Sequence, residues 1–273
     1  MDKDSLGDRM KGYENIERRY LTGRTPALIR LDGKAFHTFT KGFERPFDEI
    51  LIKTMQETTR YLCENIMGCK IGYTQSDEIQ LLLIDYDKLE TQAWFDKNIQ
   101  KMVSVSASMA TLAFNKYFKD LAREYYSIPV SIDFMPDEKQ KFYTDRYNKY
   151  CSKFDMALFD SRTYNLPKEE VCNAFIWRQQ DATRNAIQMV GQSNFSFKQL
   201  QNKSCPEIQE MLFQEKGINF NDLPEYQKRG SCIIKEEYFY GNSVRTRWIV
   251  DEKIPIFTQN RFYIEKYLEP KAE

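Results

Sequence analysis

The order of apolar patterns in the N-terminal half of the chain is the feature that most limits its possible folds. A compact apolar run at residues 27–31 predicts a strand, and apolar residues three or four positions apart at 48–66 predict a helix. Two apolar runs within 69–84 predict a hairpin, residues 94–121 have a second helical pattern, and 157–160 predict another strand. This order predicts an α+β fold with the split βαβ, ferredoxin-like arrangement.

That arrangement brings two acidic motifs together. Its first two strands run parallel and its third strand lies between them, so the loop joining the second and third strands lies beside the end of the first. Asp32 follows the first strand, and Asp77 and Glu78 occupy the hairpin tip. We therefore expect these three carboxylates to lie close together, although 45 residues separate Asp32 from Asp77.

Clustered carboxylates favour a bound cation, because they raise each other's pKa unless a positive charge neutralises them. Mg²⁺ bridges protein carboxylates to substrate phosphates, and two such ions can hold the attacking and leaving oxygens of a phosphoryl transfer. Gly33 lets an ion or phosphate approach the backbone closely. Further phosphate donors are predicted in the backbone N–H groups of Lys34, Ala35 and Phe36 and in the side chains of Arg45 and Ser76.

Each of these motifs also has a purely structural interpretation, which stays open at this point. The alternatives are a turn for Asp32-Gly33, a solvated hairpin tip for Asp77-Glu78, surface charges for Lys34 and Arg45, a packed core histidine for His37, and a packing and salt-bridge pair for Trp177-Arg178. The predicted topology and the pairing of the two acidic motifs favour the metal site.

The remaining segments predict more helices and a second hairpin. Residues 1–25 predict a short helix with a loop, and 125–150 have no regular pattern. Pro167 is expected to begin a helix that runs to about residue 190, and residues 204–217 predict another helix between Ser204 and Gly217. Residues 231–250 predict the hairpin.

Composition excludes several classes of protein. Forty basic and forty acidic residues cancel, which argues against a strongly basic nucleic-acid binder but allows a local basic surface. The single histidine excludes a multi-histidine zinc site. Six scattered cysteines favour a disulfide-free cytoplasmic protein. The sequence has neither the pattern of a signal peptide nor a stretch of about 18 apolar residues, so neither secretion nor a membrane span is predicted.

Four segments resemble motifs of the tRNA-histidine guanylyltransferase superfamily. The first two cover residues 30–37 (RLDGKAFH) and 73–78 (YTQSDE). Residues 177–181 (WRQQD) and 223–230 (LPEYQKRG) match two later motifs in the same order, and the match extends over about 10–235. Any one motif would be weak, whereas four in order are specific.

The resemblance implies a fold and a reaction. Residues 1–165 would form a palm-like catalytic core, and 166–273 a helical and hairpin extension that packs on the core and helps to bind tRNA. Such an enzyme adds nucleotides to the 5′ end of tRNA in the 3′-to-5′ direction. The 5′ end is first activated with ATP or already carries a triphosphate, and the 3′-hydroxyl of the incoming nucleoside triphosphate attacks it.

The resemblance also implies roles for individual residues. Asp32 and Asp77 would bind two Mg²⁺ ions with the carbonyl of Gly33, supported by Glu78. The residues that would bind the incoming or activating ATP or GTP are Gly33, Lys34, Ala35, Phe36, His37, Arg45, Asp48, Ser76 and Lys101. We expect tRNA to contact a local basic surface, for which Lys153, Arg178, Arg184 and Lys203 are candidates.

One departure from the family pattern bears on the reaction. Members that add G to tRNA-His carry His-Ile-Asn-Asn where this chain has TRNA at residues 183–186. The chain therefore resembles the bacterial and archaeal like-protein branch, which repairs 5′-truncated tRNA by templated addition and implies a homotetramer. The alternatives are tRNA-His guanylyltransferase proper, a palm-fold nucleotide cyclase and a non-catalytic RNA-binding module.

Overall fold

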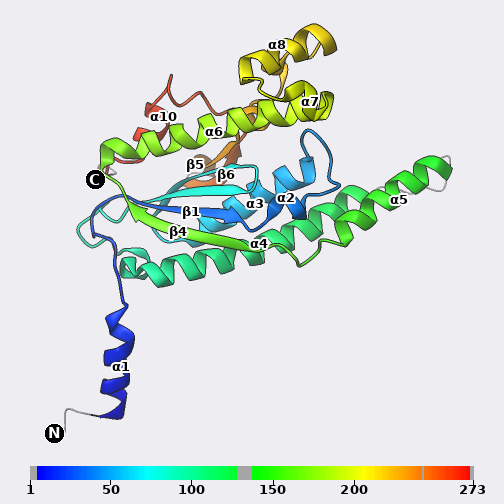
Figure 1. The fold of residues 1–273 in the computed structure, drawn as a ribbon. Coiled ribbons are helices and arrows are strands. Elements are labelled where there is room, and N and C mark those ends of the chain that lie inside the picture. The colour runs from blue at the N-terminus through cyan, green and yellow to red at the C-terminus, as the bar shows by residue number, and fades with distance from the viewer. Residues whose placement is uncertain (1–4, 128–136, 242, 271–273) are drawn as a thin grey trace.

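A six-stranded antiparallel sheet forms the centre of the protein (Figure 1). The computed structural model describes residues 5–127, 137–241 and 243–270. The strands are β1 (Ala27–Gly33), β2 (Cys69–Gln75), β3 (Glu78–Leu83), β4 (Phe159–Asn165), β5 (Ser231–Tyr240) and β6 (Ser243–Asp251). Their order is β4-β1-β3-β2-β5-β6, so β3 lies between β1 and β2, as the sequence predicts.

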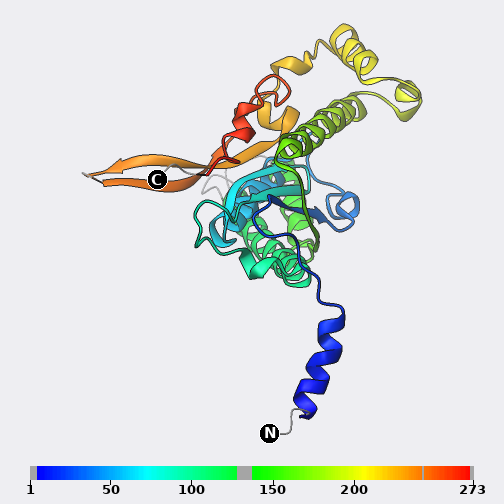
Figure 2. The ribbon, with the colours of Figure 1, turned by 90° about the vertical axis from the view of Figure 1, so that its left-hand side faces the viewer.

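Helices cover both faces of the sheet (Figure 1). They are α1 (Leu6–Ile16), α2 (Phe36–Phe39), α3 (Glu49–Asn65), α4 (Ile99–Ser127), α5 (Asp137–Cys151), α6 (Lys168–Asn194), α7 (Phe197–Leu200), α8 (Cys205–Lys216), α9 (Glu225–Arg229) and α10 (Phe262–Glu265). Short 3-10 helices occupy Trp94–Lys97 and Phe220–Asp222. Helices α3 and α4 pack on one face, and α6 and α10 on the other. Figure 2 shows α1 and the β5–β6 hairpin projecting from this body.

An aromatic cluster joins the loop after β1 to α4 and β4. Phe36 lies 4.9 Å from Phe39, 5.3 Å from Phe114 and 5.3 Å from Phe159, measured between ring centroids. A Cβ at Gly33 would lie 2.3 Å from the Phe36 ring, so only glycine allows this close approach. The cluster thereby holds the backbone that follows Asp32 against the core.

Helix α3 begins at a residue suited to cap it. The carboxylate of Asp48 accepts a hydrogen bond of 2.9 Å from the N–H of Leu51, which satisfies one of the free donors of the first turn. Met55 and Leu62 then bury the apolar side of the helix against the sheet. The predicted helix at 48–66 is confirmed.

Two segments differ from the sequence prediction. Residues 125–150 were expected to be irregular, but α4 continues to Ser127 and Asp137–Cys151 forms α5; residues 128–136 lie outside the described part. Helix α4 also begins five residues later than expected, because Phe95, Asp96 and Lys97 adopt positive φ angles that no α-helix contains.

The C-terminal elements follow the prediction closely. Pro167 immediately precedes α6, and Ser204 and Glu207 form the capping box of α8, which ends at Gly217 with φ of 65°. Strand β5 pairs with β2, so the predicted C-terminal hairpin continues the central sheet. Within the described ranges, no helix is long and apolar enough to span a bilayer.

We predict that Phe114→Ala lowers the free energy of unfolding by about 3–5 kcal/mol, because it empties the centre of the aromatic cluster. Phe197→Ala is the matched control, since that side chain is 85% exposed, and it should change the stability by less than about 0.5 kcal/mol. Urea unfolding followed by circular dichroism measures both. Equal losses for the two variants would contradict the assignment of the core.

Candidate active site

The two acidic motifs meet at one end of the sheet. Asp32 lies opposite Glu78 in the ladder between β1 and β3, and the N–H of Gly33 donates to the carbonyl of Asp77 at 3.1 Å. The expected meeting of Asp32 with the hairpin tip is therefore confirmed by the backbone register.

A cleft of about 560 Å³ opens beside these residues. Asp32 and Asp77 line it, together with most of the predicted nucleotide-binding residues: Gly33, Ala35, Phe36, His37, Arg45, Asp48 and Ser76. Lys34 and Lys101 are not among its lining residues. His37 is exposed in the cleft, so the alternative of a packed core histidine does not hold.

Electrostatics make this end of the sheet attractive to a cation. Burial raises the pKa of Asp32, and the charge of Asp160 raises it further, while Arg162 and Arg30 oppose the rise. Burial also raises the pKa of Asp77, and the negative charge of Asp32 adds to it. A divalent cation between Asp32 and Asp77 would relieve both effects.

The donor set fits Mg²⁺ that is also held by a substrate. Mg²⁺ is usually bound through one or two carboxylates plus substrate phosphates and water. Among the described residues, no group of three or more histidine, cysteine, aspartate or glutamate side chains could hold a metal. Asp32 and Asp77 therefore fit a site completed by backbone oxygen, water and phosphate, and they do not form a closed structural metal site.

The third predicted carboxylate has a protein partner. Glu78 accepts a hydrogen bond of 2.6 Å from Nε of Arg178, whose Nη2 also donates to Asp181 at 2.8 Å. The side chains of Glu78 and Arg178 are about one-tenth exposed. This ion pair joins β3 to α6, and Glu78 is not among the residues that line the cleft. Arg178 was predicted to contact RNA, but its buried position matches the alternative of a packing and salt-bridge residue.

Two predicted backbone donors are already engaged within the chain. The N–H of Gly33 bonds to Asp77, and the N–H of Lys34 bonds to the carbonyl of Leu158 at 2.8 Å. Phe36 and His37 open α2, where N–H groups have no acceptor inside the helix. Both residues line the cleft, so their N–H groups are the better candidates for phosphate contacts.

Asp48 and Arg45 differ in exposure. The carboxylate of Asp48 is buried, and it accepts hydrogen bonds from the N–H groups of Glu44 and Leu51 and from the Tyr150 hydroxyl. These bonds fix the loop before α3, so Asp48 shapes the cleft wall. Arg45 is exposed at the cleft, where its guanidinium can reach a bound anion.

Lys101 lies at the other end of the sheet. It occupies the first turn of α4, where its N–H donates to Asn98, and Asn98 forms a bridge with Tyr20, ahead of β1. Asp32 lies near the end of the same strand. Lys101 of one chain therefore does not share the cleft with Asp32.

The remaining basic candidates lie on separate elements. Lys153 Nζ approaches the carbonyl of Thr38, at the end of α2, at 3.4 Å. Arg184 is exposed on α6 and pairs with Asp181, while Lys203 pairs with Glu207 at the start of α8. Their contact with RNA stays a prediction.

Several site residues were missed from the sequence. Met189, Gln192 and Ser193 of α6 form one wall of the cleft, although they follow no recognisable motif. Asp160 stands opposite Asp32 in the β1–β4 ladder. The predicted strand at 157–160 ends at Asp160, so the sequence could have suggested that this acid lies near Asp32. Nothing in the sequence indicated which residues of α6 face the cleft.

The segment 223–230 packs against strand β2. The Tyr73 hydroxyl donates to the carbonyl of Arg229 at 2.7 Å, and Gly230 has φ of 81°. A Cβ on Gly230 would lie 2.4 Å from the carbonyl oxygen of Thr74, so a glycine is required where α9 meets β2. These contacts hold the end of α9 close against β2.

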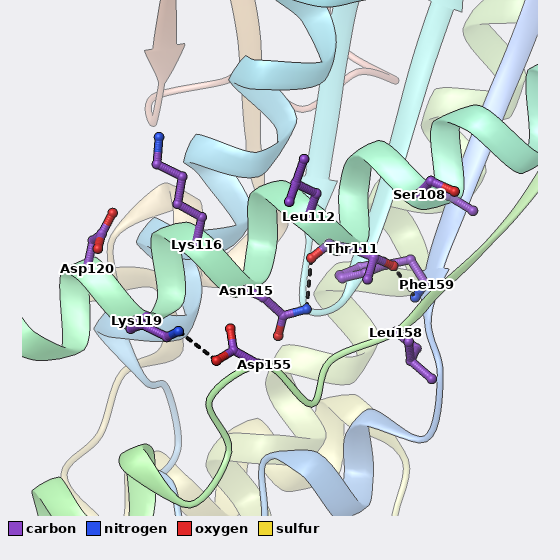
Figure 3. A pocket seen from close by; sticks show the side chains of 11 residues that line it. Ser108, Thr111, Leu112, Asn115, Lys116, Lys119, Asp120, Asp155, Leu158 and Phe159 are labelled. Atoms are coloured by element: carbon purple, nitrogen blue, oxygen red, sulfur yellow. Dashed lines mark hydrogen bonds and ion pairs between the residues drawn. The ribbon is translucent and has the colours of Figure 1, made fainter.

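A second hollow, of about 660 Å³, lies along α4 (Figure 3). Of its two acidic lining residues, Asp155 pairs with Lys119 at 2.6 Å, and the Asn115 side chain exchanges two hydrogen bonds with the backbone of Ala157. The cleft instead holds Asp32 and Asp77, whose pKa values are both raised by burial, and the charge of Asp32 raises the pKa of Asp77 further. The cleft is therefore the better candidate active site.

Comparison with known proteins identifies close relatives. The family model described as tRNAHis guanylyltransferase (Thg1) matches residues 7–167. A bacterial tRNA(His) guanylyltransferase (Thg1)-like protein solved with ATP is 46% identical, with a TM-score of 0.81, over 98% of this chain and 100% of that one. A structure of such a protein with GTP is 44% identical, with a TM-score of 0.74, over 97% and 99%. The tRNA(His) guanylyltransferase of Schizosaccharomyces pombe is 27% identical over 83% of this chain and 79% of its own length.

We predict that Arg178→Gln lowers the free energy of unfolding by about 3 kcal/mol at pH 7, because it leaves Glu78 buried without a counter-charge. Burial already raises the pKa of Glu78, and Arg178 opposes that rise. A raised pKa in the folded state stabilises the fold below the unfolded pKa, and this contribution is lost as pH rises through the folded pKa. The deficit of the variant should therefore shrink from pH 7 to pH 5.

Arg184→Gln is the control for this prediction, since Arg184 is exposed and pairs with Asp181 of the same helix. It should change the stability by less than about 1 kcal/mol at either pH. Denaturant titrations at pH 5 and pH 7 provide the comparison. A deficit of Arg178→Gln that grows on acidification would show that Glu78 does not depend on Arg178.

Proposed function

The chain belongs to the tRNAHis guanylyltransferase (Thg1) family, and from this membership we propose that it repairs 5′-truncated tRNA by template-dependent nucleotide addition in the 3′-to-5′ direction. The observation that carries the proposal is the pair of partly buried carboxylates, Asp32 and Asp77, at the edge of a nucleotide-sized cleft. Similar bacterial proteins have been solved with ATP and with GTP.

The cleft is proposed to bind the incoming nucleoside triphosphate. Arg45 and the N–H groups that open α2 would contact its phosphates. The Ser76 hydroxyl, which donates to Asp77 at 3.0 Å, would turn to a phosphate when the nucleotide is bound. Asp48 would support the base-binding wall through its bonds to the loop at Glu44. Lys101 is proposed to act in an assembly where another copy brings it to a bound nucleotide.

Asp32 and Asp77 are proposed to hold two Mg²⁺ ions with the carbonyl of Gly33. The ions would supply stabilisation of the charge on the attacking and leaving oxygens. Glu78 is proposed to support this pair indirectly, because its carboxylate is bound to Arg178. Arg178 is thus a positioning residue that holds β3 and α6 at a constant separation.

The reaction is proposed to form one phosphodiester bond at each addition. The 3′-oxygen of the incoming nucleotide bonds to the α-phosphorus of the RNA 5′ end, and its proton passes to solvent. The leaving group is pyrophosphate from a 5′-triphosphate end, or AMP from an end that ATP has activated with release of pyrophosphate. The protein's own residues align the two substrates and exclude competing water.

Templated repair is proposed over strict addition of G to tRNA-His for two reasons. Residues 183–186 lack the His-Ile-Asn-Asn sequence, and the bacterial like proteins are 46% and 44% identical against 27% for the fission-yeast enzyme. A nucleotide cyclase or a non-catalytic RNA-binding module would leave the family membership unexplained.

The broader organisation is also proposed from the family. Residues 1–165 would form the palm-type catalytic core, and 166–273 an extension that shares its sheet through β5 and helps to bind tRNA. A homotetramer in the cytoplasm would supply the extended surface that a whole tRNA needs.

We predict that the protein extends a tRNA that lacks its first nucleotide, with Mg²⁺ and the nucleotide complementary to the unpaired template base. Asp77→Asn should lower the rate on the order of a hundredfold or more, because it removes half of the proposed metal-binding pair. The assay follows a labelled tRNA on a denaturing gel with each nucleoside triphosphate in turn.

Asp120→Asn is the control, since Asp120 is exposed on α4, away from the cleft. It should extend the tRNA at the normal rate. Equal use of matched and mismatched nucleotides would disprove templating, and addition of G alone to intact tRNA-His would support the guanylyltransferase alternative. No extension by the folded protein would disprove the proposed function.

A further inference from the structure

A pair of arginines lies next to Asp32 on the face of the sheet that α6 covers. Side chains alternate along a strand, so Arg30 and Asp32 share the face of β1 that carries Leu28. Arg162 is directly opposite Arg30 in the β1–β4 ladder and therefore lies on the same face. Neither arginine lines the nucleotide cleft.

Such a pair is unfavourable in the absence of an anion, because like charges directly opposite each other on neighbouring strands repel. The charge of Asp32 interacts with both arginines, and that of Glu78 interacts with Arg30, although Glu78 is already paired with Arg178. Arg162 reaches Asp160 at 3.4 Å, but both side chains are more than half exposed, so the attraction is weak. In the described part of the chain, Arg30 has no ion pair. The two guanidiniums are thus available to a phosphate.

An exposed indole lies beside the arginines. Trp177 of α6 is 52% exposed, and the guanidinium carbon of Arg30 lies 5.3 Å from its ring centroid. The guanidinium carbon of Arg178 lies 4.5 Å from the centroid of the same ring, and Arg178 is itself held by its ion pair with Glu78. These two contacts fix the orientation of the indole, although half of its surface faces solvent. A fixed, exposed aromatic ring is a platform on which a nucleic-acid base stacks.

We propose that Arg30, Arg162 and Trp177 form a binding site for the 5′-terminal nucleotide of the RNA substrate. The guanidiniums bind the 5′ phosphate, and the indole stacks on the terminal base. The inference rests on the proposed function, which requires an RNA 5′ end to reach the reacting phosphate beside Asp32. The cleft holds the incoming nucleotide on the side of the β2–β3 tip, whereas this site approaches Asp32 from the side of β4.

The test measures binding without nucleotide addition. A fluorescent 5′-truncated tRNA is prepared with either a 5′-monophosphate or a 5′-hydroxyl, and its dissociation constant is measured by anisotropy in the absence of nucleotides. Arg162→Gln should weaken binding of the phosphorylated tRNA about tenfold and leave the hydroxyl form unchanged, because only the phosphate contact is lost. Trp177→Ala should weaken both forms about tenfold, and Trp177→Phe should restore most of the affinity.

Arg60→Gln is the matched control, because Arg60 lies on α3 and pairs with Glu57 and Glu64. It should bind both tRNA forms like the unaltered protein. Unchanged binding by Arg162→Gln, or an equal loss for both 5′ ends, would overturn the site. If Trp177→Ala unfolds, Arg30→Gln must show the same phosphate-dependent loss.

The two proposals fail separately. A protein that extends tRNA normally, yet binds phosphorylated and hydroxyl ends equally, would retain the proposed function and exclude this site. A protein that extends no RNA but shows the phosphate-dependent loss would retain the site and exclude the reaction.

Discussion

Six consecutive residue pairs join β1 to β3, from Ala27 opposite Leu83 to Asp32 opposite Glu78. This ladder places Asp32, at the end of β1, beside the tip of the β2–β3 hairpin. The N–H of Gly33 then donates a hydrogen bond to the carbonyl of Asp77 in that tip. A slip of one residue would move Asp32 to the face that α3 and α4 cover, since side chains alternate along a strand. The candidate site therefore depends on the register of one strand pair, which the buried residues of both faces maintain.

The α6 helix converts that end of the sheet into a site with two sides. Its buried Arg178 binds Glu78 on β3, while Gln179 bonds to Phe257 and Pro255 ahead of α10. With the helix held at these points, Met189 lies over the cleft and Trp177 lies beside Arg30. Within the motif at 177–181, Arg178 and Gln179 thus hold the helix in place, while Trp177 stands exposed.

Local patterns were sufficient for most elements of the fold. Asp48, Pro167 and the Ser204–Glu207 capping box mark helix starts through short-range hydrogen bonds or a restricted backbone, and these effects operate within a few residues. The region of α5 was missed because its side chains are mostly polar and its helix has little apolar periodicity. The late start of α4 was missed because three left-handed residues precede it, which no residue type there indicates.

The sequence by itself determined the order of the elements, the meeting of Asp32 with the tip that carries Asp77, and the family resemblance, because each follows from periodicity or from ordered short motifs. Only the tertiary structure decided that Glu78 and Arg178 neutralise each other, that Lys34 has its N–H engaged, and that Lys101 lies far from the cleft. It also decided that Trp177 stands exposed beside two arginines. The partners and exposure of these side chains depend on how α6 is rotated and on how far each strand extends. Packing between segments that are distant in the chain sets both.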